Sequence, residues 1–331
     1  MPVSDKLVIK QLDLELNGGC NYKCPMCPQS NGREREFLKK LPYEVFTKII
    51  DDACQYGLEG VSIHGSGEPL LNRDADKFIK YIKSKSLRCV SFTNGSRLDE
   101  EMSIKLIKSG IDLIRISCVG YDRETYKKWM SRDEYEKVRK NIKRFIELNK
   151  ELKGNTEVQL YNLIIDNKSV KKEIEMYKSN WVEYTGAKSE IWLMHNWAGS
   201  NVELNYNRHK IPNKKLEKRS CGRPFAPMLQ VRAGGLDGHY GAVVACCVTL
   251  GKDSQAVLGH LDNQTIEEIV KGKKYEELRL AHKENRFDDI DYCKDCDMLY
   301  DIPESLVWTN CENRNYGQSI IVEEIFHSSY T

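Results

Sequence analysis

Three cysteines near the start of the chain have the spacing of a metal-binding loop. Cys20, Cys24 and Cys27 form a C-x3-C-x2-C array that follows Gly18 and Gly19. Cysteine thiolates are the usual ligands of iron–sulfur clusters, and a [4Fe–4S] cluster normally takes four of them. Three thiolates on one short loop would therefore leave one iron open to an external chelator. A zinc loop with a fourth ligand elsewhere in the chain is the alternative.

This array resembles the signature of the radical S-adenosylmethionine (SAM) superfamily, which follows the first strand of a partial (β/α)6 barrel. The resemblance implies that SAM chelates the open iron through its amino and carboxylate groups. One electron then cleaves SAM to a 5′-deoxyadenosyl radical, which abstracts a hydrogen atom from the substrate. The position before the third cysteine is often aromatic in the family and is Met26 here, whose side chain can still cover an adenine face.

A glycine-rich segment further along agrees with a SAM site. Residues 64–70 read HGSGEPL, and Gly65, Ser66, Gly67 and Glu68 resemble the family's GGE motif. The resemblance implies that this backbone and the Glu68 carboxylate receive the SAM ammonium. Glycine permits a close approach of the backbone, and a carboxylate suits an ammonium group. A plain turn is the alternative.

Polar residues also end the next two expected strands. Thr93 and Asn94 end the third, and Ser117 ends the fourth. In the family, residues at these places contact the ribose and carboxylate of SAM, so the resemblance assigns all three to cofactor binding. The pair Asn94-Gly95 is also a common turn sequence.

A second group of cysteines lies in the last third of the chain. It resembles the SPASM/twitch extension of radical SAM enzymes, in which a Cys, a G-x4-C and a later C-x2-C hold an auxiliary [4Fe–4S] cluster. The ligands that this resemblance implies are Cys221, Cys246, Cys293 and Cys296. The full SPASM pattern continues with further cysteines, but Ile302 stands where the next would fall. We therefore expect the shorter twitch form and about eight irons per chain in two clusters. A zinc ribbon is the alternative.

Two further cysteines are candidates for chemistry. Cys247 stands beside an expected ligand, and in some radical SAM peptide epimerases a cysteine so placed returns a hydrogen atom to the substrate. A thiol S–H bond is weak enough for this. The resemblance thus suggests Cys247 as the hydrogen-atom donor and Cys311 as a second candidate. Both can equally be buried or idle thiols, because free cysteine is commonly buried.

The remaining pattern predicts the elements that position these residues. Short apolar runs alternate with segments of helical spacing, which is typical of parallel βα units in an α/β fold. The expected strands are 12–16, 61–65, 89–95, 113–119, 158–166 and 190–197, and the expected helices are 43–56, 74–85, 98–109, 133–149 and 168–180. Pattern alone does not separate a barrel from a doubly wound sheet, but both place ligand sites at the carboxyl ends of the strands.

The pattern changes after about residue 205. Segment 206–221 is basic and polar and reads as a linker, and a helix is expected from Thr265 to His282. We expect a radical SAM barrel over residues 1–205, and a linker with a twitch/SPASM-like domain over 206–331. Single cysteines within apolar patterns, Cys54, Cys89 and Cys118, are expected in the core.

Bulk properties exclude few functions. The formal net charge of +2 gives no strong field that favours nucleic acid or membranes. No segment approaches the roughly 18 apolar residues of a membrane span, and the chain start lacks a secretory pattern. A cytoplasmic protein without nucleic-acid or membrane partners is therefore expected.

The favoured function is an epimerase that converts L- to D-residues in a ribosomally synthesised peptide, as in natural-product biosynthesis. Only 19 residues precede Cys20, which leaves no room for an N-terminal precursor-recognition domain. The alternatives are a dehydrogenase or epimerase of a sugar, aminoglycoside or aminocyclitol, and another peptide-modifying maturase. The hypothesis from a different functional class is a non-catalytic iron–sulfur or zinc protein. The expected partners are a precursor peptide or small carbohydrate and a flavodoxin- or ferredoxin-type electron donor.

Overall fold

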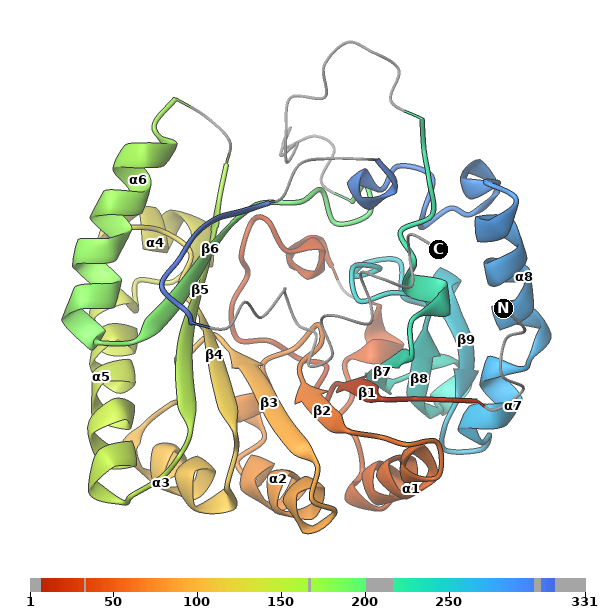
Figure 1. The fold of residues 1–331 in the computed structure, drawn as a ribbon, viewed down its shortest axis with the longest axis horizontal. Helices are drawn as coiled ribbons and strands as arrows, with labels where there is room; N and C mark the ends of the chain where they lie inside the picture. Colours follow the sequence, from red (N-terminus) through yellow and green to blue (C-terminus); the bar gives the residue numbers. More distant parts are fainter. Residues whose placement is uncertain (1–6, 33, 166–167, 201–216, 301–304, 313–331) are drawn as a thin grey trace.

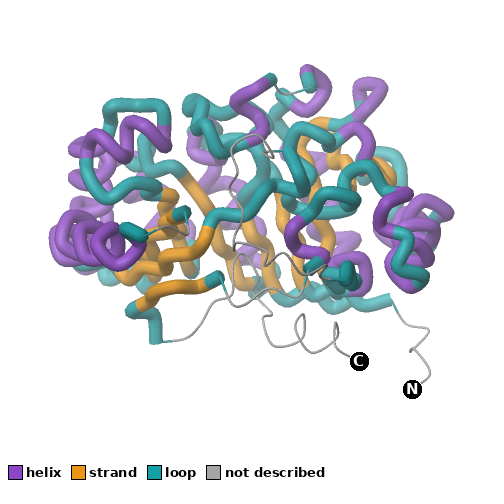
Figure 2. The backbone as a smooth tube through the Cα atoms, turned by 90° about the horizontal axis from the view of Figure 1, so that it is seen from above, coloured by secondary structure: helices purple, strands orange, loops and turns teal. Residues whose placement is uncertain are grey.

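The described part of the chain folds around one curved sheet of ten strands (Figure 1). The computed structural model describes residues 7–32, 34–165, 168–200, 217–300 and 305–312. Seen from above, the strands follow a curve with helices on its outer side (Figure 2). The strand order is β10-β6-β5-β4-β3-β2-β1-β7-β8-β9. None of the helices in the described ranges is both long and apolar enough to cross a bilayer.

Six parallel strands and the helices between them form the first part of the molecule. The strands are β1 (Gln11–Leu14), β2 (Gly60–Ile63), β3 (Arg88–Thr93), β4 (Leu113–Ser117), β5 (Glu157–Ile164) and β6 (Lys188–Leu193). The helices are α1 (Tyr43–Cys54), α2 (Ala75–Ser84), α3 (Glu100–Ser109), α4 (Arg123–Met130), α5 (Tyr135–Glu151) and α6 (Val170–Tyr177). Each strand pairs in parallel with the next along the chain, so the predicted βα architecture is confirmed.

Apolar spacing explains how the helices attach to the sheet. On α1, Phe46, Ile49, Ile50 and Ala53 are buried, as their helical spacing predicts. Cys54 was expected in the core with Cys89 and Cys118, but this expectation is wrong, whereas the other two are buried. The helix ends at Cys54, where the side chain lies near the surface groups of Asp51 and Lys85.

The later part of the chain extends the same sheet at both edges. β7 (Met228–Gly234) pairs in parallel with β1, and the antiparallel strands β8 (Tyr240–Val244) and β9 (Val257–His260) follow it. β10 (Leu306–Thr309) pairs antiparallel with β6. The sequence pattern did not predict these four strands. The predicted division between residues 205 and 206 lies outside the described residues.

The helix expected from Thr265 to His282 is two helices. Thr265 and Glu268 form a capping box at the start of α7 (Ile266–Val270), and α8 (Lys273–Lys283) follows directly. Gly272 separates them with an extended backbone (φ −74°, ψ 154°). Glycine is a weak helix former, which explains why the chain turns here.

Candidate functional site

The loop after β1 presents the three cysteines of the first array. Cys20 is exposed, and Cys24 and Cys27 are half-buried. The loop closes on itself, since Cys27 N donates to Cys24 O (2.9 Å) and Ser30 Oγ donates to the same oxygen (2.6 Å). Three accessible sulfurs on one short, self-bonded loop fit a cluster with one iron left open.

The connection between α4 and α5 holds this loop from outside. Ser131 Oγ donates to Lys23 O (2.6 Å), and the Arg132 guanidinium donates to Asn21 O (3.1 and 3.2 Å). Tyr22 OH donates to Glu134 (2.8 Å). These contacts join residues more than 100 positions apart, and no sequence motif indicated them.

The Glu68 carboxylate joins the ends of β2 and β3. It is 2% exposed, and it accepts hydrogen bonds from Leu70 N (3.0 Å), Thr93 Oγ1 (2.6 Å) and Asn94 N (2.7 Å). Burial raises the pKa of this carboxyl above its ordinary value, whereas the three donors act in the opposite direction. An ionised carboxylate has about four acceptor sites, so three internal donors leave room for one further donor.

Close packing explains the glycines of the HGSGEPL segment. A Cβ at Gly67 would lie 1.9 Å from Asn17 O, and one at Gly65 would lie 2.3 Å from Glu15 Oε2. Asn17 Nδ2 donates to Gly19 O (2.8 Å) and Glu68 O (3.1 Å), which ties the cysteine loop to this segment. Only glycine permits so close an approach of the two loops.

Other predicted cofactor residues lie nearby with partners of their own. The Asn94 side chain donates to Asn21 Oδ1 (3.0 Å), which links β3 to the cysteine loop. Ser66 N donates to Glu15, and Ser117 is half-buried at the end of β4. Met26 is 5% exposed and packs within the main core. The cofactor roles of these residues stay predictions.

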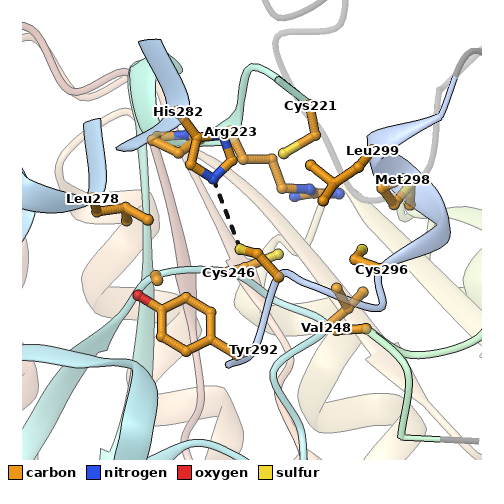
Figure 3. A pocket seen from close by; sticks show the side chains of 14 residues that line it. Cys221, Arg223, Cys246, Val248, Leu278, His282, Tyr292, Cys296, Met298 and Leu299 are labelled. Carbon is orange, nitrogen blue, oxygen red and sulfur yellow. Dashed lines mark hydrogen bonds between the residues drawn. The ribbon is translucent and has the colours of Figure 1, made fainter. Parts of the chain in front are cut away.

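The second group of cysteines lines one pocket (Figure 3). Figure 3 shows side chains that enter it from separate segments. The lining includes Cys221, Cys246, Cys293 and Cys296, together with apolar side chains such as Leu278. Among the described residues, no three His, Cys, Asp or Glu side chains converge closely enough to hold a single metal ion. The four cysteines of the expected ligand set thus line one shared space.

The histidine in this pocket contacts a predicted ligand. His282 Nε2 lies 3.7 Å from Cys293 Sγ (dashed line in Figure 3). His282 Nδ1 lies 3.1 Å from Ser220 Oγ. Burial lowers the pKa of His282 to about 4 and raises that of the Cys293 thiol to about 12.

Neighbouring cysteines on the turn after β8 have different surroundings. Cys246 lines the pocket and Cys247 does not. Cys247 is half-buried, and its pKa is raised by the Cys246 side chain, by burial and, more weakly, by Asp13 on β1. The buried Arg232 donates to Cys247 O (3.2 Å) and pairs with Asp253 (3.3 Å). The turn is thus fixed from the sheet, and the Cys247 thiol lies near the Cys246 side chain and the Arg223 guanidinium as well as Asp13.

Cys311 lies apart from both groups of cysteines. Its sulfur contacts Ser189 O (3.7 Å) near the start of β6. The first array follows the carboxyl end of β1, so Cys311 is at the opposite end of the parallel strands. The structure does not bring it to the candidate site.

Comparison with known proteins gives the family. The profile of the radical SAM superfamily matches residues 14–161, and that of the SPASM iron–sulfur cluster-binding domain matches 238–297. A probable GTP 3′,8-cyclase of Methanococcus maripaludis is 32% identical over 140 residues, which cover 42% of this chain and 46% of that protein. Fe-coproporphyrin III synthase of Methanosarcina barkeri is 34% identical over 110 residues, 33% and 27% of the two chains. The chain therefore spans less than half the length of these relatives.

Two solved structures share the fold. BtrN in complex with AdoMet and 2-DOIA has a TM-score of 0.57 and 19% identity, over 88% of this chain and 94% of that chain. Streptococcus suis SuiB bound to the precursor peptide SuiA has a TM-score of 0.62 and 13% identity, over 88% and 71%.

These matches and the described geometry agree. The chain belongs to the radical SAM superfamily and, by its C-terminal extension, to the SPASM group. The predicted cofactors are those of this family: SAM, the [4Fe–4S] cluster that binds it, and an auxiliary iron–sulfur cluster. The loop at 20–27 and the pocket in Figure 3 are the two places that fit clusters.

Proposed function

We propose that this radical SAM enzyme epimerises a residue in a ribosomally made peptide, with Cys247 as the hydrogen-atom donor. The observation that carries the proposal is the placement of two adjacent cysteines: Cys246 lines the auxiliary pocket, whereas Cys247 does not line it and lies beside the Cys246 side chain. Because Cys246 is the proposed ligand, Cys247 is not needed as one.

The proposed ligand sets follow from the two sites. Cys20, Cys24 and Cys27 hold the SAM-binding cluster, while Glu68 keeps one acceptor position for the SAM ammonium. The auxiliary ligands are Cys221, Cys246, Cys293 and Cys296. The proposed domains remain 1–205 for the barrel and 206–331 for the linker and cluster-binding extension.

Each group has a defined part in the reaction. The bound cofactors supply the radical that removes a hydrogen atom from the substrate carbon. The S–H bond of Cys247 then breaks as a new C–H bond forms on the opposite face. One electron and one proton must restore the thiol. We propose a flavodoxin- or ferredoxin-type protein as the source of the electron.

Heavy water tests the donor. The enzyme, SAM and dithionite are incubated anaerobically in D2O with a candidate precursor peptide encoded beside the gene. We expect one deuterium at the inverted carbon, because a thiol exchanges with solvent. Cys247→Ala should still consume SAM but give no D-residue, and Cys54→Ala serves as the control at an exposed cysteine. Full epimerisation by Cys247→Ala would contradict the assignment.

A second candidate is a dehydrogenase or epimerase of a sugar or aminocyclitol. The likeness to BtrN, which covers 94% of that chain, favours it. In this case no thiol donor is needed for oxidation, so the product would be oxidised and unlabelled in D2O. That outcome would favour the dehydrogenase and exclude epimerisation of either kind of substrate.

A further inference from the structure

His282 is a buried imidazole that the proposed reaction does not use. We propose that its Nε2–H donates a hydrogen bond to the Cys293 sulfur and thereby raises the reduction potential of the auxiliary cluster. The inference rests on the proposed ligand set for that cluster. Hydrogen bonds to sulfur ligands are among the factors that set the potentials of iron–sulfur clusters.

The position of the ring favours a contact with this sulfur. His282 lies near the end of α8, is 2% exposed and lines the same pocket as the four cysteines. Its Nε2 is 3.7 Å from Cys293 Sγ, a distance typical of hydrogen bonds to sulfur. Phe287 packs edge-on against the ring, with centroids 5.2 Å apart, and limits its rotation.

The contact of the other ring nitrogen is compatible with this donor. Gly222 N donates to Ser220 Oγ (3.2 Å), so this oxygen acts as an acceptor there. The hydroxyl hydrogen of Ser220 is then available for His282 Nδ1 at 3.1 Å. If Nδ1 accepts from Ser220, the ring proton lies on Nε2, which faces Cys293. Ser220 thus orients the donor from the chain segment that carries Cys221.

The proposed hydrogen bond affects the transfer of one electron to the auxiliary cluster, and no atom is transferred. Adding an electron increases the negative charge on the cluster and its thiolates. A hydrogen-bond donor at one thiolate stabilises the reduced form more than the oxidised form. Because the donor is buried and contacts Cys293, its effect acts on one sulfur at short range.

A potentiometric titration followed by electron paramagnetic resonance tests the inference. The full-length protein carries both clusters, and the SAM-binding cluster serves as the internal reference. His282→Leu should make reduction of the auxiliary cluster about tenfold less favourable, which for a one-electron couple is about 59 mV. His282→Gln keeps an N–H donor and should restore most of the potential. Ser220→Ala should give a smaller change in the same direction.

The control is His260→Leu, which removes another imidazole outside the pocket and should leave both potentials unchanged. An unchanged potential in His282→Leu, with both clusters at full occupancy, would overturn the inference. So would loss of the auxiliary cluster in both His282 variants with the first cluster intact, because His282 would then be a ligand.

The iron content of the wild-type protein distinguishes a failure of this inference from a failure of the proposed function on which it rests. About four irons per chain, instead of about eight, would mean that the proposed ligand set is wrong, and the inference would fall with it. Two intact clusters with no effect of His282→Leu would overturn the inference alone. If His282→Leu does not fold, Ser220→Ala is compared with the wild-type protein, and an unchanged potential in Ser220→Ala would overturn the inference.

Discussion

The two candidate cluster sites are built in opposite ways. At the first, three cysteines lie within eight positions of the sequence, and polar contacts from distant loops hold them. At the second, four cysteines come from three separate segments and meet around a largely apolar pocket. Ligands that lie close together in the sequence can be recognised from their spacing. Ligands from distant segments are brought together only by the fold.

The largest effect should come from removing single ligands at each site. Cys24→Ala should remove about half of the iron from a protein with two four-iron clusters and abolish SAM cleavage. Cys296→Ala should remove a similar amount but leave reductive SAM cleavage in place. Iron analysis and 5′-deoxyadenosine formation measure both. Equal loss of SAM cleavage in the two variants would contradict the separate roles.

Phe37 should show how far the two regions depend on one another. It follows the first cysteine loop, is fully buried, and packs against Val244 and Val257 of the extension. The nearby Glu34 accepts a hydrogen bond from Ser254 N (3.0 Å). Phe37→Ala should cost about 3–5 kcal/mol, as for other buried aromatic residues.

Thermal unfolding of the cluster-free protein measures this cost, and Leu38→Ala, at an exposed neighbour, is the control. If Phe37→Ala and Leu38→Ala unfold alike, the first loop does not depend on the extension for its stability.

Much of the first region could be predicted from the sequence. β1 to β6 follow from apolar runs between amphipathic segments, and the cysteine loop follows from its spacing. The hydrogen bond from Arg132 to Asn21 could not be predicted, because it joins residues 111 positions apart. β10 was also missed. It is a four-residue strand whose residues are all half-buried, so it has no alternating apolar pattern.

The second region was predicted only in part. The spacing of Gly241 and Cys246 and the C-x2-C pair indicated the pocket's cysteines by resemblance. The helical pattern, however, predicts one helix where the structure has α7 and α8. His282 was expected only as the end of a helix. The contact of His282 with Cys293 depends on how α8 packs against the loop that carries Cys293. The sequence pattern contains no information on this packing.

Glu68 tests whether the polar contacts of the first region carry its stability. Glu68→Gln has one oxygen acceptor instead of two, so it cannot serve all of Leu70 N, Thr93 Oγ1 and Asn94 N. An unmet buried donor costs about 1–3 kcal/mol, and the free energy of unfolding should fall by this amount. Glu59→Gln, at an exposed carboxylate, should change little.

Equal stability of the Glu68 and Glu59 variants in urea unfolding would show that these hydrogen bonds do not hold β2 and β3 together.

The smallest effect should come from the outermost contact of the cysteine loop. Arg132→Ala removes two hydrogen bonds to Asn21 O, but this side chain is exposed and water can replace it. We expect a loss of about 1 kcal/mol or less, together with faster release of the first cluster to a chelator. The auxiliary cluster should be released at the wild-type rate, since its pocket lies on the extension. Lys140→Ala, which removes an exposed cation on α5, is the matched control. Faster release of both clusters would mean that the two regions open together rather than separately.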